Sequence, residues 1–285
     1  MFGYICRTPI PLLVPGGDGR NLQWLRGSVL SLEGNHRNEK PQVRGCLDLS
    51  MRGALYLTDA YRKEFDSTVT VSFADGIVLE ETVFYPAGGG QPSDQGEIVS
   101  EHGDRWKVLS VEKAGNEILH KVEGIPPTVG MKVHGTLDWN LRYAHMRYHT
   151  CLHLLSGVVF HKYGSAITGN QIYADRARMD LTLNEFTPTF AQDIIREVNE
   201  VAGRHLPVSV RFLNREEADR DPALVRVARN LMPDVKEVRL IDIEGFDVQA
   251  DGGTHVANTR EVGKIQLLRT ENKGARNKRL YVTLT

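Results

Sequence analysis

The sequence is poor in several features that would assign a protein to a class at once. Its 285 residues include three cysteines, Cys6, Cys46 and Cys151, which are too few and too scattered for a disulfide framework. No apolar run approaches the roughly eighteen residues of a membrane span, and the N-terminus lacks the charged segment and long apolar stretch of a secretory signal. We therefore expect a cytoplasmic protein with free thiols and no membrane contact.

An excess of charge of one sign is also missing. The formal net charge is −1, whereas domains that bind nucleic acid usually carry a visible basic excess. With 41% hydrophobic and 25% charged residues, the composition is that of an ordinary globular chain with room for two domains. Composition alone therefore does not indicate a function.

Two separate fragments look like halves of one metal site. In His149-Thr150-Cys151-Leu152-His153 the spacing places both imidazoles on one face of a helix, one turn apart, where a single cation reaches both. In Asp251-Gly252-Gly253-Thr254-His255 two glycines precede further ligand types, which indicates a tight loop that turns its side chains inward. Together the fragments predict one bound cation, and the imidazoles favour zinc.

These fragments, and others between them, resemble the editing domain of alanyl-tRNA synthetases and the free-standing AlaX proteins. The resemblance implies the larger AlaX form, with an N-terminal barrel that bears a glycine-rich motif. It also implies one Zn²⁺ per chain and hydrolysis of tRNA(Ala) that carries serine or glycine by mistake. The matching segments are HTCLHLL (149–155), GFDVQADGGTHVANTREVGKI (245–265), DWNLRYAHMRYH (138–149), TGNQIYADRARMDL (168–181) and FYPAGGGQPSDQG (84–96).

The chain departs from the synthetase motif at one presumed ligand, because Asp251 stands where the synthetases have cysteine. Two arrangements fit. Either His149, His153, His255 and Asp251 all bind the metal, or the three histidines bind it and Asp251 orients a water in the fourth position. Cys151 is a further candidate to supply sulfur, although it also fits a small buried apolar residue.

The expected fold is α+β, with a small antiparallel β-barrel at 51–138 followed by an α/β two-layer editing domain at 139–285. Residues 1–50 show no sustained periodicity and read as a poorly ordered extension, or as translated sequence upstream of a start at Met51. Apolar runs separated by turn residues predict the barrel strands, and helical spacing predicts two later helices. The predicted strands are 69–73, 77–79, 106–111, 118–122 and 133–137, and the predicted helices are 141–163 and 190–202.

Several residues are candidates to contact tRNA. Gly89, Gly90 and Gln91 form a loop that either approaches the acceptor end or only makes a tight turn between strands. Basic side chains near the first histidine pair and in a predicted hairpin around Asn272-Lys273-Gly274 fit phosphate contacts. The cations near the histidines fit local ion pairs equally well. Those of the hairpin fit equally well a solvated edge hairpin without a ligand. These basic candidates are Arg142, Arg147, Lys273, Arg276, Lys278 and Arg279.

The catalytic candidates are Thr168, Gln171 and Asp251. Because alanine is smaller than serine, size alone cannot reject it, and a polar contact to the serine hydroxyl must do so; Thr168 and Gln171 are candidates for that contact, or serve only turn chemistry. The metal could activate water or anchor the substrate. Two rival functions fit the same residues, a metal hydrolase of small esters or amides and an inactive tRNA-binding module. The sequence leaves open a monomer or a homodimer.

Overall fold

We describe a computed structural model of the chain, which covers residues 53–183, 186–220, 224, 236–274 and 277–285. The extension predicted at residues 1–50, with Cys6 and Cys46, lies outside these described residues, and so does Arg276. Within the described part, no helix combines the length and the apolar character needed to cross a bilayer.

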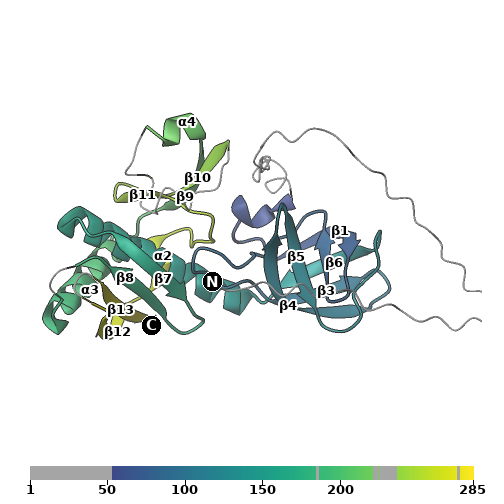
Figure 1. The fold of residues 1–285 in the computed structure, drawn as a ribbon, viewed down its shortest axis with the longest axis horizontal. Coiled ribbons are helices and arrows are strands. Elements are labelled where there is room, and N and C mark those ends of the chain that lie inside the picture. Colours follow the sequence, from purple (N-terminus) through teal and green to yellow (C-terminus); the bar gives the residue numbers. More distant parts are fainter. Residues whose placement is uncertain (1–52, 184–185, 221–223, 225–235, 275–276) are drawn as a thin grey trace, which may run out of the picture. The chain divides into compact units, whose positions relative to one another are not determined.

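The N-terminal half of the described chain is a closed antiparallel barrel, as the sequence predicts (Figure 1). A short 3-10 helix, η1 (Leu55–Leu57), precedes it, and the strands follow one another around the barrel in the order β1-β2-β5-β4-β3-β6. These strands are β1 (Glu64–Ser72), β2 (Gly76–Leu79), β3 (Gly96–Ser100), β4 (Arg105–Ala114), β5 (Glu117–Val122) and β6 (Lys132–Leu137).

Alternating apolar residues fill the barrel interior, where Phe65, Ile77, Phe84 and Ile98 are at most 2% exposed. The five strand predictions fall on β1, β2, β4, β5 and β6 and are confirmed. Strand β3 was missed, because GEIVS contains only two large apolar residues and directly follows the glycine-rich loop. Its pairing with β6 and β4 closes the barrel, which a local pattern cannot reveal.

The second half is built on an antiparallel sheet with the order β12-β13-β8-β7, against which two helices pack (Figure 1). Its core lies between the helices and the sheet and includes Leu154, Leu155, Ile194 and Leu280, none of which is exposed. The elements are α2 (Trp139–Tyr163), β7 (Ile167–Ile172), β8 (Ala177–Leu181), α3 (Pro188–Ala202), β12 (Ile265–Asn272) and β13 (Lys278–Leu284). The predicted α+β class is therefore confirmed.

Helix α2 carries the first histidine pair and has well-defined ends. The side chain of Asp138 caps its N-terminus by accepting the N–H of Leu141, and Gly164 ends it with a φ of 59°. The helix is buried from Tyr148 to Val159, because one side packs against the sheet and the other sides pack against further segments of the protein. His149 and His153 are thus held inside the protein, whereas His161, near the end of the helix, faces solvent.

A second, three-stranded sheet delivers the other half of the site. It has the order β11-β10-β9 and is antiparallel throughout. The short 3-10 helix η4 follows the Gly-Gly-Thr-His loop. The elements are β9 (Val208–Asn214), α4 (Arg215–Ala218), β10 (Glu237–Ile243), β11 (Asp247–Ala250) and η4 (Thr259–Val262).

Candidate metal centre

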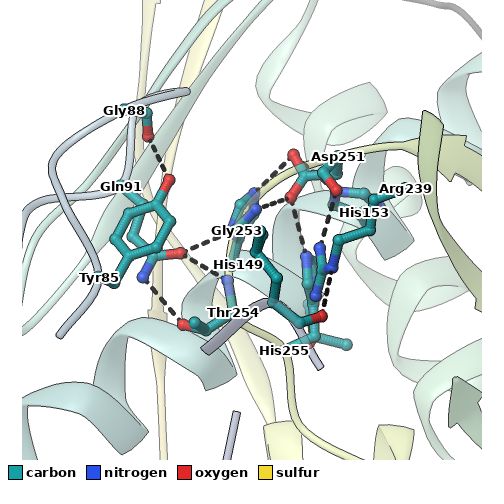
Figure 2. A network of polar contacts seen from close by, with 12 residues as sticks. Tyr85, Gly88, Gln91, His149, His153, Arg239, Asp251, Gly253, Thr254 and His255 are labelled. Carbon is teal, nitrogen blue, oxygen red and sulfur yellow. Dashed lines mark hydrogen bonds and ion pairs between the residues drawn. The ribbon is translucent and has the colours of Figure 1, made fainter. Parts of the chain in front are cut away.

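Helix α2 contributes two imidazoles that face the same point. His149 and His153 are one turn apart and are 3% and 7% exposed. Their Nε2 atoms lie 3.4 and 3.8 Å from Oδ2 of Asp251, which comes immediately after β11. The helix spacing therefore places both rings as predicted, and Figure 2 shows them directed at the same carboxylate.

The loop after β11 contributes the carboxylate and the third imidazole. His255 Nε2 lies 3.3 Å from Asp251 Oδ1, and the N–H of Gly253 donates to the same oxygen at 2.5 Å. A Cβ on residue 253 would lie 2.2 Å from Cε1 of His149, so only glycine allows the loop to approach the helix this closely. This contact explains a glycine directly before Thr254-His255.

The four side chains form a set that fits a metal ion. One ligand atom from each of His149, His153, Asp251 and His255 lies within 4.8 Å of the others. In a tetrahedral zinc site with bonds of about 2.0–2.1 Å, ligand atoms are about 3.3 Å apart. Two separations match that value, 3.3 Å from His255 Nε2 to Asp251 Oδ1 and 3.4 Å from His149 Nε2 to Asp251 Oδ2. Three imidazoles and one carboxylate are also a donor set that zinc accepts.

The electrostatics of the cluster favour the protonation states that bind a metal. Burial raises the pKa of Asp251, but the charge of His149 and hydrogen bonds from the three imidazoles outweigh it and hold that pKa well below its usual range. Burial, together with the charges of His149 and His153, holds the pKa of His255 well below its ordinary value. An anionic carboxylate and a neutral imidazole are both ready to ligate.

Hydrogen bonds from outside the cluster hold its rings in place. Gln91 Oε1 lies 2.9 Å from His149 Nδ1, and Thr150 Oγ1 lies 3.2 Å from His255 Nδ1. Both contacts use the ring nitrogen that faces away from Asp251, so the Nε2 atoms remain directed at the site. Thr150 was not predicted, although it lies between the two helix histidines in the motif.

Arg239 is a functional neighbour that the sequence analysis missed. It is 5% exposed on β10, and its Nη1 donates to the main-chain carbonyl of Asp251 at 2.8 Å. Its Nε donates to the carbonyl of Leu57 at 2.9 Å, so one guanidinium joins the metal loop to η1. A signal was present, since a cation inside the otherwise apolar run 238–241 needs buried partners.

The glycine-rich loop forms a tight turn, one of the two alternatives that the sequence left open, and it packs against β7. Gly88 and Gln91 exchange two main-chain hydrogen bonds, and between them Gly89 and Gly90 have φ values of 58° and 86°, as a type I′ turn requires. Gly90 O accepts the N–H of Ile172 at 2.8 Å. Gly89 is exposed, but Gln91 is 2% exposed and hydrogen-bonded to metal-site residues, so its predicted contact with tRNA is wrong.

Arg142 and Arg147 bind groups within the protein. Arg142 is fully buried and forms an ion pair with Asp94, which follows the glycine-rich loop. Its predicted contact with phosphate is therefore wrong, and the alternative of pairing with a local carboxylate is the arrangement found. Arg147 is partly buried and donates to the carbonyls of Glu261 and Val262 at 2.9 and 2.8 Å. Its guanidinium thus tethers η4 to α2.

The predicted C-terminal hairpin exists as β12 and β13, but most of its described cations have local partners. Lys278 is 5% exposed and donates to Asn272 Oδ1 and Gly274 O, and Arg279 pairs with Asp180 at 2.5 Å. Lys278 is buried, so its predicted phosphate contact is wrong, whereas Arg279 is only partly buried and its phosphate contact stays a prediction. Lys273 is exposed and pairs with Glu271 at the surface, where a phosphate could replace that partner.

The remaining candidates lie outside the four-ligand cluster. Thr168 is exposed, and its hydroxyl donates to Asn277 Oδ1 at 3.4 Å; Gln171 Nε2 donates to Gly90 O at 3.2 Å. Cys151 is fully buried in the core between α2 and the sheet, where burial raises the pKa of its thiol. It therefore fits its alternative reading as a small apolar residue.

Comparisons with known proteins agree with this geometry. Two family models match, "tRNA synthetases class II (A)" over residues 47–141 and "Threonyl and Alanyl tRNA synthetase second additional domain" over residues 238–281. The fold and site thus define a protein assembled from domains that tRNA synthetases also carry.

Relatives specify the family. The chain is 40% identical over 236 residues to the alanyl-tRNA editing protein AlaX-M of Saccharolobus solfataricus, which covers 82% of this chain and 99% of the relative. It is 39% identical over 241 residues to the protein of the same name from Methanosarcina barkeri, with the same coverage. The alanine–tRNA ligase of Thermococcus kodakarensis is 40% identical over 230 residues, which cover 79% of this chain and 25% of the ligase. The chain belongs to the AlaX family of alanyl-tRNA editing proteins.

Proposed function

We propose that this protein is an aminoacyl-tRNA deacylase that acts in trans on mischarged tRNA(Ala) in the cytoplasm. It releases serine, and glycine less efficiently, by metal-assisted hydrolysis of the ester. The observation that carries the proposal is the convergence of His149, His153, Asp251 and His255, from two distant segments, within 4.8 Å. Membership of the AlaX family supplies the substrate class.

Zinc is the proposed metal, with one ion held by the three imidazoles and by Asp251. When bound, such an ion lowers the pKa of a coordinated water toward neutrality or anchors a polar group of the substrate. The carboxylate contributes a negative charge that offsets the cation in a buried site. The Gly253 N–H donates to Oδ1 of Asp251, which leaves Oδ2 directed at His149 and His153.

The ester bond is already activated, so the protein has mainly to position water and substrate and to stabilise the oxyanion that forms. Rejection of alanine requires a polar contact that alanine would leave unpaired. Thr168 and Gln171 are the proposed contacts for the serine hydroxyl. Their position on β7, the strand that receives the glycine-rich loop, supports this role. Glycine would enter only because of its small size.

Binding of tRNA is proposed to use the exposed Lys273 and the exposed turn at Gly89. Arg276, which lies outside the described residues, is retained as a candidate from the sequence.

The first test is the rate at which labelled serine is released from seryl-tRNA(Ala), measured beside alanyl-tRNA(Ala). Purified protein is assayed as isolated, after chelation and after zinc is restored. We expect release of serine that chelation abolishes and zinc recovers, with alanyl-tRNA(Ala) spared. Equal cleavage of both esters would contradict the hydroxyl contact. Cleavage of a small seryl ester at the same rate as the tRNA ester would favour a small-ester hydrolase instead.

A further inference from the structure

We propose that Gln91, on the glycine-rich loop of the barrel, is a positioning residue that fixes which nitrogen of His149 faces the metal. This inference rests on the proposed metal binding at the site and assigns a role to a residue that the sequence had placed at the tRNA. Its side chain is 2% exposed and lies between His149 and Thr254 (Figure 2).

The orientation of the Gln91 amide is determined by Thr254. The main-chain N–H of Thr254 can only donate, and it lies 3.1 Å from Gln91 Oε1. At the other end, Gln91 Nε2 donates to Thr254 Oγ1 at 2.9 Å. Reversing the amide would place its NH₂ group against the main-chain N–H, where two donors would face each other. The two contacts with Thr254 therefore fix which end of the amide is the oxygen and which is the nitrogen.

This fixed amide in turn determines the tautomer of His149. Oε1 is an acceptor only, and it lies 2.9 Å from His149 Nδ1, so Nδ1 must carry the proton of this contact. In the neutral imidazole Nε2 then has a lone pair, and Nε2 is the atom 3.4 Å from Asp251 Oδ2. Without a metal, a second proton on Nε2 can donate to that carboxylate, and a bound metal would take the place of this proton.

The loop backbone is held independently of this side chain. Gly90 O accepts hydrogen bonds from the Ile172 N–H and from Gln171 Nε2, and the hydroxyl of Tyr85 donates to Gly88 O at 3.0 Å. A Cβ at Gly90 would lie 1.7 Å from Oδ1 of Asn170, so the loop is pressed directly onto β7. Removing the Gln91 amide should therefore leave the loop in place and change the orientation of His149.

The barrel thus contributes directly to the metal site. Outer-shell partners of metal-binding histidines typically contribute 10–100-fold in affinity, because a ring that is free to rotate or change tautomer binds less well. We expect Gln91→Met, which keeps the length of the side chain but cannot accept from Nδ1, to weaken zinc binding by about that factor. Gln91→Glu, whose carboxylate still accepts from Nδ1, should retain zinc affinity within a few-fold.

The experiment measures the zinc affinity of full-length protein by competition with a chromogenic chelator. Tyr85→Phe is the matched control, because it removes a hydrogen bond of the same loop without touching His149, and its affinity should equal that of the wild type. Thermal unfolding of the zinc-free proteins shows whether each variant folds. Equal zinc affinity in Gln91→Met and the wild type would overturn the inference, as would equal losses in Gln91→Met and Tyr85→Phe.

A second measurement needs no Gln91 variant. Long-range ¹H–¹⁵N spectra of the zinc-free wild type report the tautomer of each histidine, with His149→Asn used to assign the signal. We expect a proton on Nδ1 of His149, whether or not Nε2 is also protonated, and a ring protonated on Nε2 alone would overturn the inference. A wild type that binds no zinc would instead overturn the proposed metal site, and with it the role of Gln91.

Discussion

The four-ligand cluster and the C-terminal hairpin were both identified by residue type. In the structure the side chains of the cluster converge, whereas those of the hairpin bind separate local partners. In the cluster, three histidines and Asp251 direct their ligand atoms at one point within 4.8 Å. In the hairpin, Lys278 and Arg279 are bound to groups of the same protein. The difference lies in geometry, because the cluster combines a helix-specific spacing with a glycine-enforced loop, whereas the hairpin was identified by charge alone.

A run of cations is compatible with many local partners, and the carboxylate that neutralises Arg279 comes from a strand about a hundred residues away in the sequence. The same holds for Arg142, whose partner Asp94 lies beside the glycine-rich loop. Residues four apart on a helix, in contrast, always lie on the same face, whatever the rest of the fold. The predictions that follow test this contrast.

The largest effect is expected at Asp251. If its carboxylate ligates the metal, Asp251→Ala should weaken zinc binding by more than the roughly 100-fold typical of an outer-shell change. Asp251→Cys should retain zinc, because thiolate is a good zinc ligand, and its Co²⁺ form should show thiolate-to-cobalt absorption in the near ultraviolet. Asp251→Ser is the matched control without a thiolate. A cobalt-bound Cys variant that lacks this absorption would mean that residue 251 only orients a water.

Next in size is the cost of breaking the buried ion pair of Arg142. Arg142→Met leaves Asp94 buried without its cation and should lower the free energy of unfolding by about 3–5 kcal/mol. The double variant Asp94→Asn/Arg142→Met should recover part of that loss, since no charge is left unpaired. Urea unfolding measures both. Unchanged stability together with weaker tRNA binding would restore the phosphate interpretation.

A histidine outside the metal cluster should affect stability through pH. His120 is buried in the barrel, with Nε2 2.8 Å from Thr82 Oγ1, and burial lowers its pKa from 6.5 to about 4. Between these values the unfolded chain binds the proton and the native protein does not, so stability falls as pH drops through this window. The full contribution is on the order of 3 kcal/mol.

The measurement is the free energy of unfolding at pH 7.5 and pH 5 for wild type and His120→Gln. The variant should lose less stability between the two values, because it has no proton to gain at that position. Identical pH dependence in both proteins would contradict the lowered pKa of His120, because the other histidines contribute equally to both.

The smallest effects separate the two kinds of cation in the hairpin. Arg279→Gln removes one of the two arginine partners of Asp180, the other being Arg178, and should cost about 1–2 kcal/mol of stability without changing the salt dependence of tRNA binding. Lys273→Ser should leave stability within about 0.5 kcal/mol and reduce the salt slope by about one. A reduced slope for Arg279→Gln would place that guanidinium at the tRNA after all.

Much of the fold could be predicted because its signals are local. Helical spacing placed α2 at 141–163, within two residues of its observed start at Trp139, and short apolar runs marked five of the barrel strands. Strand β3 was not predicted, because it forms through pairing with β4 and β6 and its own sequence carries little strand signal.

The sequence by itself identified the four candidate metal ligands, which the structure brings together, since a three-residue gap on a helix and a Gly-Gly-Thr-His loop allow few other arrangements. Only the tertiary structure decided which groups support them. Gln91, Thr254 and Arg239 are brought to the site by contacts between segments as much as 182 residues apart. Such contacts depend on how the glycine-rich loop packs on β7 and α2. Partners so far apart in the sequence leave no periodic pattern from which they could be predicted.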